Sequence, residues 1–410
     1  MPALVNVHEA RGVNEWKRGW RIVLGCALGS GTGVVLLFFT FSIFILPIIA
    51  EFGGTRGDLA NVQALVVSGA LGSPVIGWAT DRFGFRRVFL SCMVSVILLE
   101  LWTGLFAASI FGLAVAIFLI SLIGVGSTAL TVTRPVNAWF DANRGLALGF
   151  AAMGSAIATI IVPPLLEAIV ADHGWRVGFL ALAGLAACIG LPAVYWLVEN
   201  EPPSGPDAAI AQKLPNNWAF LAEPQFWLMA VSLMAMGAAG AGFIGQMSPM
   251  IQQEGLSAVV AALALSAFAG GQVCGRLSGG WCLDRFDPRL IAVMLNLLPA
   301  AGFIILWMVQ GSTGLALLAA FLIGFQQGAE LDIFAYFTAR RFGIAQYGTV
   351  YGALLGLSWI GNAVGLIGVG RLHDLNGDYA LAQLLGAASL GFGALLISAV
   401  RLPGRGSAPA

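Results

Sequence analysis

Gln272-Val-Cys-Gly-Arg-Leu-Ser-Gly-Gly-Trp-Cys-Leu-Asp-Arg-Phe-Asp-Pro-Arg289 is the stretch that indicates how the whole chain is built. Its second half, Gly280-x-x-x-Asp284-Arg285-Phe286-x-x-Arg289, repeats Gly77-x-x-x-Asp81-Arg82-Phe83-x-x-Arg86 after 203 residues (284 minus 81). Its first half places Arg276 inside an apolar run. The same offset relates Gly145, Gly149 and Gly174 to Gly348, Gly352 and Gly377. Matches at one constant offset indicate an internal duplication.

The composition is that of a polytopic membrane protein. Of the 410 residues, 59% are hydrophobic and 10% are charged, whereas about 25% of a soluble domain is charged. Apolar runs long enough to cross a hydrocarbon core about 30 Å thick recur along the chain. They cover residues 20–50, 58–80, 87–108, 111–138, 144–171, 175–198, 225–252, 256–281, 289–310, 313–339, 345–371 and 378–401. We therefore expect an all-α membrane protein with twelve transmembrane helices in two pseudo-symmetric six-helix bundles.

A proline-rich hydrophilic segment at 199–224 predicts a linker between the two bundles, because this composition breaks helices. The expected domains are a tail at 1–19, one bundle at 20–198, the linker, a second bundle at 225–401 and a tail at 402–410. With the N-terminus inside, fifteen Lys and Arg residues lie inside the cell and three outside. This asymmetry predicts that both termini are cytoplasmic. The Ala and Gly content favours a bacterial plasma membrane, and we expect a monomer.

Several classes of function are excluded by what the sequence lacks. The formal net charge is zero, which argues against nucleic acid as a partner. The five cysteines form no metal-binding or redox pattern, so no metal and no cofactor are expected. The chain has no His-Glu-x-x-His, no Gly-x-Ser-x-Gly and no Walker motif. We therefore predict a protein that is not an enzyme and is not driven directly by ATP.

Charged side chains within apolar runs are the strongest indication of function, because they are costly in a membrane. Arg276 is such a residue. Glu330 and Asp332 are two more, and at 100° per residue they point about 200° apart. Glu330 shares a helix face with Gln326, and Asp332 shares one with Tyr336. We expect one carboxyl to carry the proton and the other to pair; Glu330 is preferred as the proton site, and a structural role for both is the alternative.

Other candidate residues have weaker signals. Gln246, Trp359 and Asn362 have the character of cavity walls, although polar side chains also join helices. Arg134 is near the end of its helix and is either a gate or an anchor. The acid and arginines of the loop from Asp81 to Arg87 suit pairing with each other and with neighbouring helix ends. The residues predicted to control conformation are Asp81, Arg82, Arg86, Asp284, Arg285 and Arg134.

Six plus six helices with Gly77-x-x-x-Asp81-Arg82-x-Gly84-x-Arg86-Arg87 resemble the major facilitator superfamily. Asn137-Ala-Trp-Phe140 with Arg144-Gly145, Gly174-Trp-Arg176, and Arg276 four residues before Gly280 are similar to its monocarboxylate transporter and oxalate/formate antiporter branch. The resemblance implies the major facilitator fold and implies that Arg276 binds a substrate carboxylate. Three features depart from the branch. Gln272 stands where animal monocarboxylate transporters have an aspartate, and Leu354 stands where the oxalate antiporters have a lysine. The first run also lacks the lysine that the animal transporters have there.

Together these observations predict a secondary active transporter that moves a small organic anion by alternating access. A monocarboxylate is the expected substrate, moved with protons or by anion exchange. The predicted substrate-binding residues are Arg276, Gln272, Gln246, Trp359 and Asn362, and the expected partners are the substrate, protons and membrane lipids. A drug/proton antiporter or a neutral-solute facilitator of the same fold is the alternative. The first lacks support because the fifth run has no clear Gly-Pro motif, and Arg276 favours an anion over a neutral solute.

Overall fold

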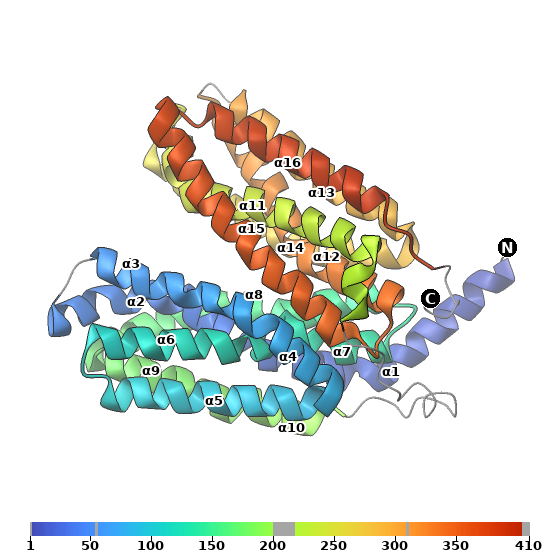
Figure 1. The fold of residues 1–410 in the computed structure, drawn as a ribbon, viewed down its shortest axis with the longest axis horizontal. Helices are drawn as coiled ribbons and strands as arrows, with labels where there is room; N and C mark the ends of the chain where they lie inside the picture. The colour runs from blue at the N-terminus through green and yellow to red at the C-terminus, as the bar shows by residue number, and fades with distance from the viewer. Residues whose placement is uncertain (1, 54–55, 200–217, 309–310, 404–410) are drawn as a thin grey trace. The chain divides into compact units, whose positions relative to one another are not determined.

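A computed structural model describes residues 2–53, 56–199, 218–308 and 311–403. This part of the chain consists of helices joined by short turns (Figure 1). Most of the predicted linker, residues 200–217, and most of the predicted C-terminal tail, residues 404–410, lie outside the described residues.

The elements follow one another along the chain, and η marks short 3₁₀ or π turns. They are α1 (Pro2–Gly31), α2 (Val34–Phe52), α3 (Arg56–Ala64), η1 (Leu65–Ser68), α4 (Gly69–Phe83), α5 (Phe85–Phe106), α6 (Ile110–Gly124), η2 (Val125–Ser127), α7 (Ala129–Trp139), α8 (Arg144–His173), α9 (Trp175–Leu185), η3 (Ala186–Gly190), α10 (Leu191–Leu197), η5 (Ala219–Ala222), α11 (Pro224–Gln253), α12 (Ala258–Arg285), α13 (Pro288–Trp307), α14 (Thr313–Phe342), α15 (Tyr347–Asn376) and α16 (Ala380–Ser398).

Within the described residues, 12 helical stretches are long and apolar enough to cross a membrane. The predicted all-α fold with twelve spans is therefore confirmed. Some spans combine consecutive elements; α6, η2 and α7, for example, form the single stretch Ile110–Trp139. The helix α1 begins at Pro2, so the segment expected as a polar tail is helical and continues into the first span.

The chain divides into two compact units, each of which is described by itself. Unit 1 comprises residues 1–142, 150–217 and 344–356, and unit 2 comprises residues 143–149, 218–343 and 357–410. The first turn of α8 thus belongs to unit 2, and the first turns of α15 belong to unit 1.

Unit 1 is built around a cluster of apolar side chains from α2, α3, α5, α6, α8 and α9. Phe44 and Phe179 are fully buried, and their ring centroids lie 4.5 Å apart. The sequence between α1 and α2 breaks the helix at Gly33, where the Val34 N–H donates to Ser127 Oγ at 3.0 Å. Gly33 therefore marks a local break between the two helices.

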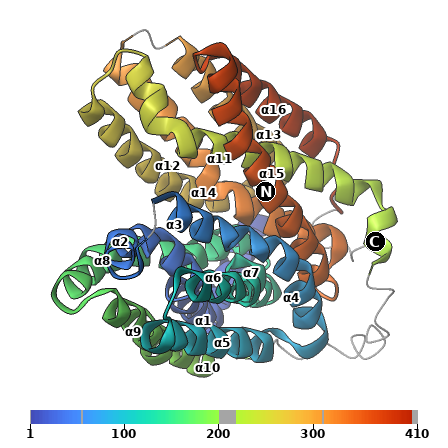
Figure 2. The same cartoon turned by 60° about the vertical axis from the view of Figure 1, so that its left-hand side comes forward.

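In unit 2, α12 and α14 run side by side along much of their length (Figures 1 and 2). Small residues permit this close approach. A Cβ atom added at Gly275 would lie 1.8 Å from the Phe325 carbonyl oxygen, and one added at Gly328 would lie 2.0 Å from the Gln272 carbonyl oxygen. Gly-rich faces let helix backbones pack this closely in a membrane. The packing fixes which residues of α14 face Arg276.

Candidate functional site

Arg276 lies half-buried on α12 and is held against α14. Its Nε donates a hydrogen bond to the Gly328 carbonyl oxygen at 3.1 Å. This carbonyl is accessible because Gly328 has no side chain and sits against the α12 backbone. The planar guanidinium has a fork geometry that suits a carboxylate.

The two buried carboxyls of α14 have different surroundings. Glu330, 5% exposed, accepts hydrogen bonds from Gln326 Nε2 at 3.0 Å and from Gln327 Nε2 at 2.9 Å. These partners belong to its own helix, and the contact with Gln326 is the one that helical spacing predicts. Asp332 is 3% exposed and lies within electrostatic reach of Arg276. Its Oδ2 has no hydrogen-bond partner among the described residues.

Asp332 therefore lies within electrostatic reach of Arg276, whereas Glu330 accepts hydrogen bonds from two amides of its own helix. Which of the two carboxyls carries the proton stays a prediction. Helical spacing shows that the two carboxyls diverge, but it does not show which of them faces α12.

The remaining predicted substrate residues are placed on three helices. Gln272 is half-buried one turn before Arg276 on α12. Trp359 and Asn362 are half-buried on α15, where the Asn362 side chain packs against Gly237 of α11. Gln246 of α11 accepts a hydrogen bond from the Tyr379 hydroxyl at 3.0 Å, at the start of α16. This contact ties Gln246 to a helix junction.

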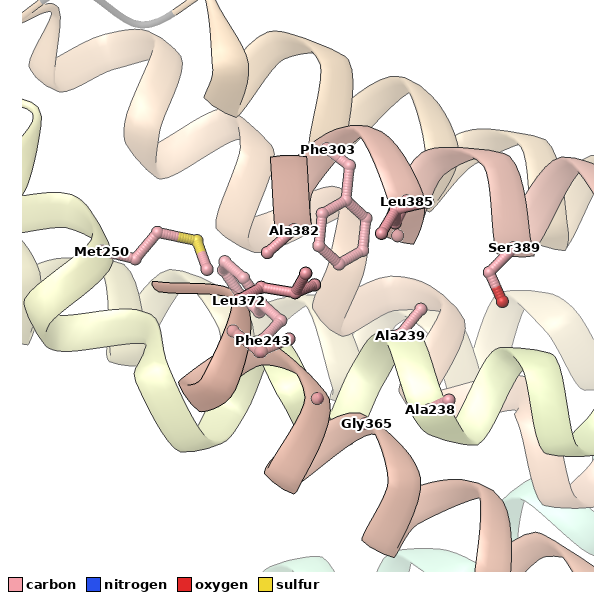
Figure 3. Close-up of a pocket in the computed structure, with 13 residues that line it drawn as sticks. Ala238, Ala239, Phe243, Met250, Phe303, Gly365, Leu372, Ala382, Leu385 and Ser389 are labelled. Carbon is pink, nitrogen blue, oxygen red and sulfur yellow. The ribbon is translucent and has the colours of Figure 1, made fainter. Parts of the chain in front are cut away.

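An apolar cavity of about 170 Å³ lies in unit 2 between α11, α13, α15 and α16 (Figure 3). Phe243, Phe303, Leu372 and Leu385 contribute to its lining. None of the predicted substrate residues lines it. Its apolar walls do not suit a carboxylate, so it is distinct from the Arg276 site.

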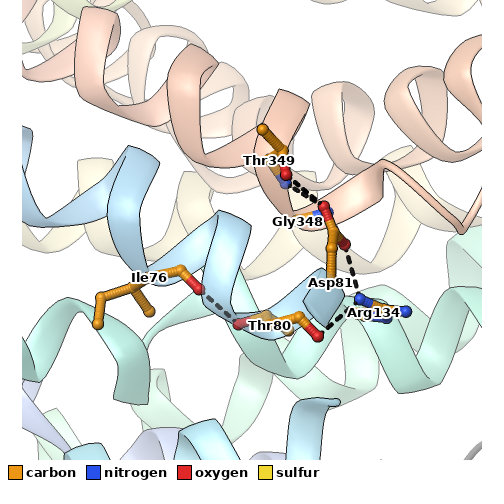
Figure 4. A network of polar contacts seen from close by, with 6 residues as sticks. All are labelled: Ile76, Thr80, Asp81, Arg134, Gly348 and Thr349. Carbon is orange, nitrogen blue, oxygen red and sulfur yellow. Dashed lines mark hydrogen bonds and ion pairs between the residues drawn. The ribbon is translucent and has the colours of Figure 1, made fainter. Parts of the chain in front are cut away.

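In unit 1, the polar contacts of the repeated loop are centred on Asp81 (Figure 4). Its carboxylate accepts from Arg134 Nη1 at 2.6 Å, from Gly348 N at 2.8 Å, and from both the N–H and the hydroxyl of Thr349 at 2.6 Å. Side chains of Asp81 and Arg134 are only 2% and 7% exposed. Arg134 Nη1 also donates to the Thr80 carbonyl oxygen at 2.9 Å.

Unit 2 has a related arrangement at the second copy of the loop. Asp284 accepts from the backbone N–H groups of Gly145 at 2.7 Å and Leu146 at 2.9 Å, at the start of α8. An acidic side chain is favourable at this position, because a helix N-terminus carries partial positive charge. The prediction that the acid of the first loop pairs with a neighbouring helix end is confirmed by the hydrogen bonds of Asp81 with Gly348 and Thr349.

The loop arginines have aromatic neighbours. The Arg82 guanidinium lies 5.6 Å from the Trp78 ring centroid, and Arg285 lies 4.5 Å from the Trp281 ring centroid. Arg86 donates to the Tyr195 carbonyl oxygen and lies 4.6 Å from the Tyr195 ring centroid. The cation that pairs with Asp81 is therefore not one of these loop arginines but Arg134, which comes from α7.

Sequence reasoning did not identify Thr349, whose hydroxyl is a partner of Asp81. The repeat offers the missing signal. The offset that relates Asp81 to Asp284 also relates Gly145 to Gly348, and these glycines start the helices that the aspartates cap.

Comparisons with known proteins agree with this architecture. The sequence model of the Major Facilitator Superfamily matches residues 28–366. Monocarboxylate transporter 11 of Mus musculus is 27% identical over 405 residues, which cover 90% of this chain and 84% of the relative. Monocarboxylate transporter 13 of Rattus norvegicus is 26% identical over 385 residues, which cover 91% of this chain and 86% of the relative.

The crystal structure of the E. coli fucose:proton symporter superimposes with a TM-score of 0.72, over 92% of this chain and 97% of that chain. At 14% sequence identity this likeness concerns the fold alone. The predicted major facilitator fold is confirmed. With the family match spanning most of the chain and twelve candidate spans in the described residues, the protein belongs to the Major Facilitator Superfamily, a family of secondary transporters and not of enzymes.

Proposed function

We propose that this transporter carries a small organic anion, namely a monocarboxylate, and that Arg276 binds the substrate carboxylate. The observation that carries the proposal is a guanidinium within a membrane span, held by a backbone carbonyl and close to a buried aspartate. A planar guanidinium matches a carboxylate with two parallel hydrogen bonds. Relatives named monocarboxylate transporters support the same substrate class.

Asp332 is our candidate for the coupling carboxyl. When ionised, it neutralises Arg276 while the site is empty. When Asp332 takes up a proton, Arg276 is free to hold the substrate anion, so one proton and one monocarboxylate enter the site together. Glu330 then has a supporting role, because Gln326 and Gln327 already donate hydrogen bonds to its Oε2.

Alternating access of the two bundles would expose the loaded site first to one side of the bilayer and then to the other. Gln272, Trp359 and Asn362 would line the path of the substrate, and Asp81 and Asp284 would hold one conformation by capping α15 and α8. We further propose a plasma-membrane location with both termini in the cytoplasm, from the distribution of Lys and Arg. Exchange of two anions is the alternative mode of coupling.

The test is uptake of labelled aliphatic and aromatic monocarboxylates into proteoliposomes, with and without an inward proton gradient. We expect gradient-driven uptake by the native protein. Arg276→Lys should lower uptake about 10- to 100-fold, which corresponds to about 1.5–3 kcal/mol for hydrogen bonds to a charged group. Asp332→Asn should abolish the response to the gradient.

Glu330→Gln is the matched control, since it removes a buried carboxyl from the same helix on a different face. It should retain the gradient response. Normal transport by Arg276→Lys would contradict the role of the arginine fork. Uptake of neutral solutes, without uptake of any carboxylate, would favour a neutral-solute facilitator instead.

A further inference from the structure

A pocket with polar residues in its lining lies in unit 1, at the turn between α4 and α5. It has a volume of about 320 Å³ and is lined by Phe83, Gly84, Phe85, Arg86, Arg87, Pro135 and Glu199. Gly84 has a φ of +83°, which permits the tight turn and brings both arginines to the rim of the pocket. The pocket contains neither Arg276 nor the carboxyls of α14.

The two arginines are not neutralised in the described part of the chain. Arg86 is held by the Tyr195 carbonyl oxygen and packs on the Tyr195 ring, and a carbonyl does not cancel its charge. Arg87 is exposed and has no hydrogen bond or ion pair with the described residues. Glu199 also lines the pocket but forms no ion pair there with either arginine. The lining therefore retains net positive charge.

The surroundings of the pocket are apolar and face outward. Phe83, Tyr195 and Trp196 are large exposed side chains at the same end of the bundle. Exposed aromatic residues at the end of a span are typical of the lipid headgroup region. A guanidinium pair beside such residues suits a ligand with an anionic phosphate and apolar chains.

We propose that this pocket binds the phosphate of an anionic membrane lipid, with Arg86 and Arg87 as its ligands and the acyl chains along the exposed aromatic side chains. Arginine recognises phosphate through parallel hydrogen bonds, and basic pockets between transmembrane helices bind anionic headgroups. Free phosphate has the same charged group but cannot use the apolar surroundings. The lipid is therefore expected to bind more tightly than the ion.

The experiment titrates the purified full chain in detergent with short-chain phosphatidylglycerol, with phosphatidylcholine of the same chain length, and with inorganic phosphate. We expect phosphatidylglycerol to bind most tightly and its affinity to fall with added salt. Arg87→Ala should weaken this binding about fivefold, and Arg86→Ala with Arg87→Ala should weaken it about 25-fold. Glu199→Gln should strengthen it, because a negative charge leaves the lining.

Arg289→Ala is the matched control, since Arg289 occupies the position of Arg86 in the second copy of the repeat. It should leave the affinity for phosphatidylglycerol within about twofold of the native value, because it lies outside the pocket. Unchanged affinity in both arginine variants would overturn the proposed site, and Arg87→Ala decides this even if the double variant does not fold. Equal affinity for phosphatidylcholine, or tighter binding of inorganic phosphate, would overturn the assignment to an anionic lipid.

Discussion

Asp81 in unit 1 and Asp284 in unit 2 occupy equivalent positions of the duplicated sequence, yet their surroundings differ. Both accept hydrogen bonds from two successive backbone N–H groups at the start of a helix. Beside Asp81, Arg134 adds a buried cation and Thr349 adds a hydroxyl. At the same offset, unit 2 has Phe337 in place of Arg134 and Leu146 in place of Thr349.

This difference separates the contacts of the two aspartates into a backbone part and a side-chain part. The backbone part recurs in both units, because it needs only an aspartate and the glycines that permit close approach. The Arg134 and Thr349 contacts occur in unit 1, and a buried ion pair is sensitive to loss of either partner. Substitutions at matched positions should therefore have unequal effects where the units differ, and similar effects where they agree.

The largest effect is expected for Asp81→Asn, because it leaves the Arg134 guanidinium buried without its carboxylate. We expect a loss of about 3–5 kcal/mol in the free energy of unfolding. Asp284→Asn should cost less, about 0.5–2 kcal/mol for its contribution to the helix cap, because Phe337 stands at the position of the buried Arg134. Unfolding of both variants by denaturant or by heat, in the same detergent, measures the difference between their stabilities.

A double variant sharpens this first comparison. Asp81→Asn combined with Arg134→Met removes both charges and should recover much of the stability lost in Asp81→Asn alone. Equal losses in Asp81→Asn and Asp284→Asn would show that Arg134 contributes little to the stability of unit 1.

Similar losses in the free energy of unfolding are expected where the units agree, for Gly348→Ala and Gly145→Ala. A Cβ atom at Gly348 would lie 2.4 Å from the Gly77 carbonyl oxygen, and one at Gly145 would lie 2.2 Å from the Gly280 carbonyl oxygen. Either alanine variant must push two helix backbones apart, at a cost of about 1–3 kcal/mol. The two variants should show closely matched shifts in unfolding temperature. A large shift at one site alone would mean that the backbone packing is not equivalent in the two units.

A smaller effect is expected for Thr349→Val, which removes the hydroxyl bonded to Asp81 but keeps the branched shape. The loss should be about 1 kcal/mol, the net contribution of one hydrogen bond. Thr349→Ser should retain most of the stability. Leu146→Val is the control at the matched position, where the native side chain has no hydroxyl to lose.

The fold could be predicted from the sequence to the level of twelve spans, because helix length and apolar composition are local properties. Which helices lie next to each other is not local. The sequence therefore leaves Arg134 between a gate and an anchor, although it indicates Asp81, the carboxylate partner, as a candidate. Its pairing depends on how α7 packs against α4, and no periodicity within either helix encodes that.

Glu330 and Asp332 show the same limit within the candidate site. Their divergence follows from helix geometry, whereas their orientation relative to α12 depends on the contacts of Gly275 and Gly328 with neighbouring backbone. A glycine pattern on two helices indicates that each can pack closely. It does not indicate that they pack with each other.

The smallest effects, but of opposite sign, are expected at a second matched pair beyond the spans, Glu51 in unit 1 and Glu254 in unit 2, again 203 residues apart (254 minus 51). Hydrogen bonds from Arg176 at 2.6 Å and from Trp175 at 2.7 Å hold the pKa of Glu51 below its ordinary value. At the position of Arg176, unit 2 has Tyr379. Burial raises the pKa of Glu254, and the neighbouring charge of Asp378 raises it further.

A lowered pKa means that Glu51 stabilises the fold above the ordinary glutamate pKa of about 4.3 and loses this contribution as the pH falls through its folded value. A raised pKa means that Glu254 contributes stability below about pH 4.3 and loses it as the pH rises through its folded value. At pH 7, Glu51→Gln should therefore lower the unfolding temperature and Glu254→Gln should raise it. Each change in the free energy of unfolding should be under about 1 kcal/mol, since both groups are partly exposed and solvent screens them. Both differences from the native protein should shrink as the unfolding measurements move toward about pH 4, and effects of the same sign at pH 7 would mean that the duplicated glutamates share one electrostatic environment after all.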